Sequence, residues 1–144
     1  MPEQQNIPEG ATGLTPVSRK SLLIVDDERA IRDVFQRVAA YGLPDCRVDV
    51  AVNGAEAVEF FRAVHHAVIL MDLAMPVMNG QEAFAEISDI CKSEGWEMPA
   101  VIFCTGFDPP DGIREVVRQN SRHCVLLKPV DHDTLLEELA SRVQ

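Results

Sequence analysis

The stretch Val68-Ile-Leu-Met-Asp72-Leu-Ala-Met-Pro-Val-Met-Asn-Gly80 decides the fold, because an apolar run ends there in an acid and a turn. Residues Ala67–Met71 are continuously apolar, which is typical of a strand at the centre of a parallel sheet. A proline and a glycine mark the turn, and a helical period follows over Gln81–Ser93. The stretch therefore predicts a strand, a turn and a helix in succession, with Asp72 close to the carboxyl end of the strand.

The same alternation of a short apolar run and a helical period recurs on both sides of this unit. Alternating strands and helices predict an α/β fold with a parallel sheet. We expect five strands, at Ser21–Val25, Arg47–Val52, Ala67–Met71, Ala100–Cys104 and Cys124–Leu127. A helix is expected after each strand, beginning near Glu28, after Asn53, near Gln81, after Pro109-Pro110 and after Asp131.

The composition indicates one globular domain with an acidic surface. The chain has 144 residues, of which 47% are hydrophobic and 25% charged, and a formal net charge of -10. This excess of acids repels nucleic acid and anionic lipid, so we expect no direct nucleic-acid binding and no membrane association. Apolar runs are far shorter than the roughly 18 residues of a membrane span, and we expect a cytoplasmic protein. Residues 1–19 are predicted to form a flexible N-terminal tail, and residues 20–144 the folded domain.

Cysteine and histidine provide no metal or redox signature. The four cysteines contain no C-x-x-C pair, and the four histidines form no H-E-x-x-H pattern. We interpret the cysteines as buried thiols: Cys46, Cys91, Cys104 and Cys124.

Polar side chains stand at the ends of four predicted strands. They are Asp26, Asp27, Asp72, Thr105 and Lys128. Ligands of open parallel sheets bind at the carboxyl ends of the strands, so we expect these side chains to form one site. Two carboxylates about 4 Å apart repel by roughly 4 kcal/mol at an effective dielectric near 20, so such a cluster requires a cation or a raised pKa. A hard divalent ion suits an all-oxygen site, and the cluster therefore predicts Mg²⁺.

These groups suit phosphoryl chemistry. Lys128 can pair with one phosphoryl oxygen and Thr105 can donate to another, which leaves Asp72 as the nucleophile of an aspartyl-phosphate route. Each residue alone also has a structural interpretation. Asp27 suits a helix N-cap and Asp72 a turn, while a lysine before proline is usually solvated and a threonine at a strand end commonly satisfies local backbone. The coincidence of these residues at the right strand ends favours the chemical interpretation.

The chain resembles the receiver domain of two-component response regulators, the CheY-like family. The resemblance extends from about residue 20 to the C-terminus, with its motifs in the family's order. They are Leu22-Leu-Ile-Val-Asp26-Asp27-Glu, the stretch that ends at Gly80, Val101-Ile-Phe-Cys-Thr105-Gly106 and Val125-Leu-Leu-Lys128-Pro129. The family implies a flavodoxin-like, doubly wound five-stranded parallel sheet of order 2-1-3-4-5 with five helices.

The resemblance implies a function and a set of site residues. Such a domain accepts a phosphoryl group from a sensor histidine kinase or phosphotransfer protein and switches the binding of a downstream protein partner or output domain. Asp72 would be the phosphoacceptor in a Mg²⁺-dependent reaction, and Thr105 and Lys128 would contact the phosphoryl group. The metal ligands would be Asp26, mainly through water, Asp27, Asp72 and the backbone carbonyl of Ala74. The family is not a class of turnover enzymes, because a receiver catalyses only its own phosphorylation and slow autodephosphorylation.

Three positions depart from the family pattern, and one peptide bond is expected to be unusual. Val125 stands three positions before Lys128, where the family often has an aromatic switch residue. Ala74 and Phe107 are apolar at two positions that flank the path of a hydrolytic water, so the phosphoryl lifetime does not follow from the family. The resemblance also implies a cis peptide bond between Lys128 and Pro129.

The residues leave other functions open. A phosphohydrolase with an aspartyl nucleophile is one, although such enzymes commonly place a second Asp two residues after the nucleophile, where this chain has Ala74. A docking module that is never phosphorylated is another. We expect either a stand-alone receiver or a module of a larger multidomain regulator or hybrid kinase.

Overall fold

The five strands form one parallel sheet in the order β2-β1-β3-β4-β5, as predicted. They are β1 Ser21–Val25, β2 Arg47–Ala51, β3 Val68–Asp72, β4 Ala100–Thr105 and β5 Cys124–Leu127. The structure is a computed structural model that describes residues 20–143. The predicted flexible tail at residues 1–19 lies outside the described residues.

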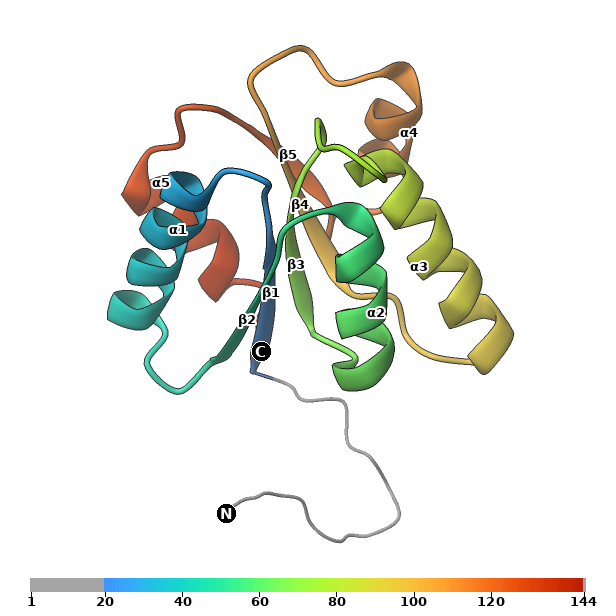
Figure 1. Cartoon of the computed structure of the whole chain (residues 1–144), viewed down its shortest axis with the longest axis horizontal. Coiled ribbons are helices and arrows are strands. Elements are labelled where there is room, and N and C mark those ends of the chain that lie inside the picture. Colours follow the sequence, from blue (N-terminus) through green and yellow to red (C-terminus); the bar gives the residue numbers. More distant parts are fainter. Residues whose placement is uncertain (1–19, 144) are drawn as a thin grey trace, which may run out of the picture.

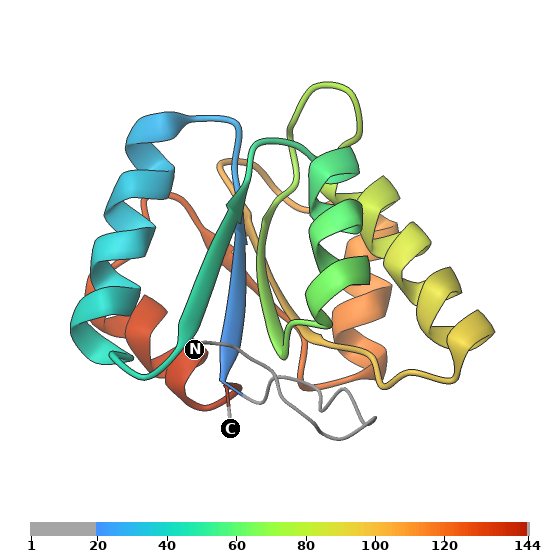
Figure 2. The same cartoon turned by 60° about the horizontal axis from the view of Figure 1, so that its bottom comes forward.

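Two layers of helices cover the sheet, one on each face (Figure 1). The helices are α1 Arg29–Gly42, α2 Gly54–Val64, α3 Gly80–Glu94, α4 Asp111–Gln119 and α5 His132–Ala140. Helices α1 and α5 lie on one face, and α2, α3 and α4 lie on the other; the turned view in Figure 2 shows the sheet between them. This is the doubly wound arrangement that the alternating pattern predicts.

Each face of the sheet has its own apolar core, because side chains alternate along a strand. Leu22 and Ile24 of β1 pack in the core beneath α1 and α5, with Phe35 and Leu135. Leu23 packs in the other core, beneath α2, α3 and α4. Strands β1, β3 and β4 are buried along their whole length, whereas the edge strands β2 and β5 are partly exposed. The predicted central place of β3 and edge place of β2 are confirmed.

Side-chain caps fix the starts of three helices. Asn53 Oδ1 accepts the Glu56 N–H at 2.8 Å, which confirms the cap predicted for α2. Asn79 and Glu82 form a capping box at α3, and Asp131 Oδ2 accepts the Thr134 N–H at the start of α5. Such caps satisfy main-chain N–H groups that have no partner within the helix.

Strands β3 and β4 end one residue later than predicted. Ala67 donates its N–H to the Ser21 side chain, and the β3 strand begins at Val68. At the other end, Asp72 pairs with Cys104 in the ladder, and Thr105 extends β4 by pairing with Leu127. Asp72 and Thr105 are therefore the last residues of strands and not the first residues of loops.

The cysteine prediction is wrong for two of the four residues. Cys91 and Cys104 are buried, whereas Cys46 and Cys124 are half-buried. Their exposure follows from their places, since Cys46 precedes the edge strand β2 and Cys124 begins the edge strand β5. Between residues 20 and 143, none of the helices has the length and apolar composition of a membrane span.

Candidate functional site

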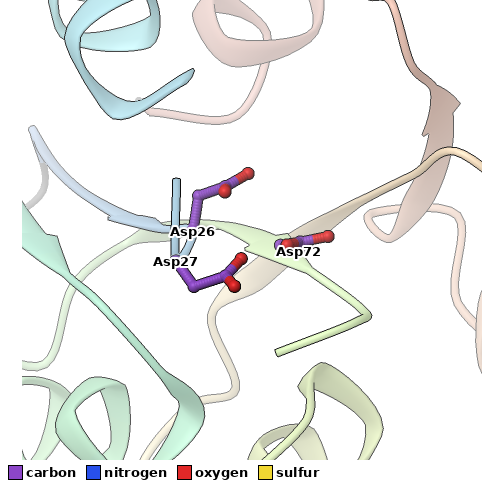
Figure 3. A group of neighbouring side chains, drawn as sticks. All are labelled: Asp26, Asp27 and Asp72. Carbon is purple, nitrogen blue, oxygen red and sulfur yellow. The ribbon is translucent and has the colours of Figure 1, made fainter. Parts of the chain in front are cut away.

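Two neighbouring strands, β1 and β3, bring the three predicted acids to one edge of the sheet. Asp26 and Asp27 directly follow β1, and Asp72 is the last residue of β3, which pairs with β1. Figure 3 shows the first two side chains at the end of β1 and the Asp72 side chain at the end of β3. Parallel pairing places the carboxyl ends of these strands together, so residues far apart in the sequence become neighbours.

The three carboxylates form one cluster. Each side chain contributes one oxygen atom to the cluster, and these three atoms all lie within 4.8 Å of one another. Asp26 is 1% exposed and Asp72 6% exposed, whereas Asp27 is exposed. The cluster thus has two buried acids and one acid open to solvent, which fits a hard ion that keeps water ligands.

Lys128 closes the cluster from the side of β5. Its Nζ lies 2.9 Å from Asp26 Oδ2 and 3.4 Å from Asp72 Oδ1. The Lys128 N–H donates to the Thr105 carbonyl at 2.8 Å, so the ladder between β4 and β5 fixes the main chain of the lysine. The peptide bond from Lys128 to Pro129 is cis, as the resemblance implied.

The electrostatics of the cluster act mainly on Asp72. Burial, together with the neighbouring Asp26 carboxylate, raises the pKa of Asp72 from 3.8 to about 6, and Lys128 offsets part of that increase. Hydrogen bonding and attraction to Asp26 and Asp72 raise the pKa of Lys128 despite its burial. Near neutral pH the site is therefore a set of crowded carboxylates beside one ammonium group.

Two hydrogen bonds from main-chain N–H groups join the loops after β3 and β4 to side chains of the site. The Ala74 N–H donates to Asp72 Oδ1 at 3.4 Å, and the Phe107 N–H donates to Thr105 Oγ1 at 3.1 Å. Thr105 is 3% exposed and pairs across the ladder with Leu127, directly before Lys128. All five predicted side chains therefore stand at the same edge of the sheet, at the ends of β1, β3, β4 and β5.

The helix-cap interpretation of Asp27 is wrong. Helix α1 has Glu28 as its N-cap residue without a side-chain cap, and the Glu28 N–H donates to Asp26 Oδ1 at 2.9 Å. Asp26 therefore takes part in the turn into α1. The Asp27 side chain is left to face the other two acids.

Two residues near the cluster were missed by the sequence reasoning. Arg32 donates from Nη1 to the Asp26 carbonyl at 2.9 Å and so holds the turn between β1 and α1. A Cβ at Gly80 would overlap the main-chain oxygen of Asp72, so only glycine lets α3 begin there. Gly80 could have been found from the sequence, because it ends the stretch from Val68 to Gly80 that predicts the strand, turn and helix. Nothing in the sequence indicates that Arg32 donates to a carbonyl six residues earlier.

The parallel sheet of order β2-β1-β3-β4-β5, with helices on both faces and an acid cluster at its carboxyl edge, defines a class, the α/β proteins of flavodoxin-like topology. Within that class, residues 22–140 match the family model of the response regulator receiver domain, and the chain belongs to this family. The match covers the ten helices and strands except for Ser21, the first residue of β1.

Individual relatives agree with the family assignment. The chain is 34% identical over 123 residues to two-component system protein A of Emericella nidulans, a match that covers 84% of this chain and 17% of the relative. It is 24% identical over 121 residues to the chemotaxis protein CheY of Halobacterium salinarum, covering 84% of this chain and 94% of the relative. The chain thus spans a small part of the first relative and almost all of the second.

A solved structure supports the fold. The receiver domain of the response regulator Ssk1, crystallised with the histidine phosphotransfer protein Ypd1 of Saccharomyces cerevisiae, superposes with a TM-score of 0.73 at 24% identity. The superposition covers 85% of this chain and 87% of that chain.

Proposed function

We propose that Asp72 is the phosphoacceptor of this receiver domain and that Lys128 and Thr105 bind the phosphoryl oxygens. The observation that carries the proposal is the position of Lys128 Nζ, 3.4 Å from Asp72 Oδ1 and inside the acid cluster. An ammonium group at this distance can pair with an oxygen on phosphorus once the phosphoryl group is bonded to Asp72. The Thr105 hydroxyl stands at the end of the adjacent strand and can donate to a second oxygen.

The acid cluster fits a magnesium ion. The oxygens of Asp26, Asp27 and Asp72 are the ligand type that Mg²⁺ prefers, and the carbonyl of Ala74 is proposed as a further ligand. When bound, the ion neutralises the charge that develops on the phosphoryl oxygens. The exposed Asp27 leaves the side of the cluster that faces solvent open for water ligands.

Asp72 has the properties of a carboxylate nucleophile. Its pKa of about 6 leaves it mainly ionised near pH 7.5, while its electron pair is more basic than that of an ordinary aspartate. Attack on phosphorus gives an acyl phosphate, with Lys128 beside the new group. Ala74 offers no acid or base for rapid hydrolysis, which favours a signalling domain over a turnover phosphohydrolase.

We propose a sensor histidine kinase or a phosphotransfer protein as the phosphodonor. A cytoplasmic location and a downstream protein partner or output domain complete the proposal. The match to a receiver domain that was crystallised with a histidine phosphotransfer protein supports this kind of donor. The net charge of -10 argues against direct binding to nucleic acid.

Phosphorylation by a small phosphodonor tests the proposal. Incubation with acetyl phosphate and Mg²⁺ is expected to add one phosphoryl group to the chain, as measured by intact-mass spectrometry, and none to Asp72→Asn. Asp33→Asn is the matched control, because Asp33 is a half-buried acid on α1 that pairs with Arg29 and lies outside the acid cluster. Equal incorporation into Asp72→Asn and the native chain would refute the assignment.

Thermal melting tests the metal ligands separately. Mg²⁺ is expected to raise the melting temperature of the native chain and to have a much smaller effect on Asp27→Ala. Binding to the folded state alone stabilises by RT ln(1 + [L]/Kd), so loss of a ligand appears as loss of the shift. An equal shift in both proteins would remove Asp27 from the ligand set.

A further inference from the structure

Asp26 is bonded at every one of its hydrogen-bonding groups, and one of its partners has no part in the chemistry proposed above. Its N–H donates to the Ala51 carbonyl at 3.2 Å, its Oδ1 accepts the Glu28 N–H, and its Oδ2 accepts Lys128 Nζ. Its carbonyl accepts Arg32 Nη1 at 2.9 Å. The main chain and the side chain of Asp26 are therefore both fixed, and Arg32 supplies the bond to the carbonyl.

Asp27, the next residue, is held differently. It is exposed, and its side chain makes no hydrogen bond to any residue between 20 and 143. The start of α1 gives it little support, because the side chain of the N-cap residue Glu28 caps no main-chain N–H. The position of the Asp27 carboxylate, beside Asp26 and Asp72 in Figure 3, is thus set by the main chain from which it extends.

Arg32 holds the peptide unit from which Asp27 extends. The carbonyl of Asp26 and the nitrogen and Cα of Asp27 belong to one planar peptide unit, so a bond to this oxygen restrains the whole unit. The main chain of Arg32 is itself fixed, since its N–H donates to the Glu28 carbonyl at 3.1 Å. A guanidinium group keeps its charge throughout the neutral range, and its bond to an oxygen is charge-assisted. This bond therefore sets the direction in which the Asp27 side chain leaves the main chain.

We propose, on the basis of the function proposed above, that Arg32 is a positioning residue of the magnesium site. It fixes the peptide unit between Asp26 and Asp27, so that the Asp27 carboxylate lies within reach of the same ion as Asp72 before the ion binds. A ligand that is held in place in advance loses less conformational freedom when the ion arrives. Groups that orient metal ligands in this way are worth about tenfold to a hundredfold in metal affinity.

The sign of the effect separates positioning from simple electrostatics. Arg32 is positive and repels Mg²⁺, so if its charge alone acted on the ion, its removal would strengthen Mg²⁺ binding. If its hydrogen bond positions Asp27, the same removal weakens binding, because the peptide unit is then free to rotate. Arg32→Met removes the charge and the donor and keeps an unbranched alkyl side chain, and therefore tests the two effects against each other.

Isothermal titration calorimetry measures the affinity for Mg²⁺ in the absence of a phosphodonor. Arg32→Met is expected to bind Mg²⁺ about tenfold more weakly than the native chain. Arg32→Gln, a second neutral variant, is expected to change in the same direction. Arg29→Met is the matched control, because Arg29 is an exposed arginine in the same turn of α1 that pairs with Asp33, and this variant is expected to bind Mg²⁺ like the native chain. Circular dichroism establishes that each variant is folded.

The dependence of the phosphorylation rate on Mg²⁺ concentration distinguishes positioning from general damage to the site. With acetyl phosphate as the donor, Arg32→Met is expected to need about tenfold more Mg²⁺ for half of its maximal rate. Its maximal rate is expected to stay close to that of the native chain. General damage would lower the maximal rate as well, because Asp72 and Lys128 would be displaced.

Mg²⁺ binding by Arg32→Met and Arg32→Gln that equals or exceeds that of the native chain would overturn the positioning role and leave the proposed function standing. A loss of the same size in Arg29→Met, or a much lower maximal rate in Arg32→Met, would also overturn it. Failure of the native chain to bind Mg²⁺, or labelling of Asp72→Asn at the native rate, would overturn the proposed function and the positioning role with it.

Discussion

Lys128 forms its shorter ion pair with Asp26 and its longer one with Asp72, at 2.9 Å and 3.4 Å from Nζ. Asp26 is 1% exposed and Asp72 6% exposed, so the ammonium group lies closer to the more buried of the two carboxylates. The ammonium group is thus shared by two carboxylates that come from different strands. One ammonium group balances only part of the negative charge of the three acids. The negative charge that is left lowers the stability of the folded state.

The first prediction concerns the charge of Asp72. The fold raises the pKa of Asp72 to about 6, so the ionised form of Asp72 destabilises the folded state. This destabilisation is complete above pH 6 and is absent below the ordinary pKa of 3.8. Asp72→Asn is expected to stabilise the chain by about 2 kcal/mol in chelator at pH 7.5, and by much less at pH 4. Urea unfolding at both pH values measures the difference. Asp33→Asn, at a half-buried position on α1 outside the acid cluster, serves as the control. A destabilised Asp72→Asn would point to a structural role for the carboxylate.

The fold and the site were predictable for different reasons. Apolar runs of five or six residues identify the strands because a parallel sheet buried on both faces excludes polar side chains, and β1, β3 and β4 show this burial. The site follows from the fold, because parallel strands bring their carboxyl ends together. Asp26, Asp72 and Thr105 could thus be placed at one edge from sequence alone.

Contacts that depend on register were not predictable. His66 lies buried with Nε2 2.7 Å from Asp49 Oδ2, and His123 Nδ1 accepts the Val101 N–H at 3.0 Å. Both contacts join different segments through side chains whose direction is set by packing. Strand ends also shifted by one residue at β3 and β4, since hydrogen bonding to a neighbour, and not side-chain hydropathy, decides where a ladder ends.

The second prediction concerns acid sensitivity. Burial lowers the pKa of His123 from 6.5 to about 4, so as the pH falls the unfolded chain takes up a proton before the folded chain does. The stability that depends on neutral His123 is complete above pH 6.5 and is lost between pH 6.5 and pH 4. The loss from pH 7 to pH 5 is expected to be about 2 kcal/mol. His123→Gln is expected to flatten this dependence in urea unfolding, whereas His132→Gln, at an exposed position, is expected to leave it intact.

The third prediction concerns the start of α3. A side chain at Gly80 would overlap the main chain of Asp72, and backbone cannot move aside as a flexible side chain can. Gly80→Ala is expected to destabilise the chain by about 3 kcal/mol and to lower the rate of phosphorylation by acetyl phosphate. Gly106→Ala is the control for stability, because a Cβ there meets no atom within 4 Å. Equal melting temperatures for the two variants would contradict the close approach.

The fourth prediction concerns a strained loop residue. Val77, in the loop between β3 and α3, has a φ of 70° and is 83% exposed. A β-branched residue is strained in this left-handed region, which asparagine tolerates better. Val77→Asn is expected to raise the unfolding free energy by about 1 kcal/mol. Val52→Asn changes an exposed valine outside the left-handed region and is expected to bring no gain, so an equal gain in both variants would count against backbone strain.

The fifth prediction returns to the ion pair of Lys128 and Asp26. Removal of the ammonium group in Lys128→Met leaves two buried carboxylates facing each other, with an expected loss of about 3 kcal/mol in chelator. Asp26→Asn removes one of these charges while its side-chain oxygen can still accept the Glu28 N–H, so its own effect is expected to be small. In the double variant Asp72 no longer faces a second buried charge, because Asp27 is exposed to solvent, and most of the loss is expected to be recovered, with a coupling of about 2 kcal/mol. Urea unfolding of the four proteins measures this cycle. Strictly additive effects would mean that Lys128 stabilises the fold by packing of its alkyl chain and not by its charge.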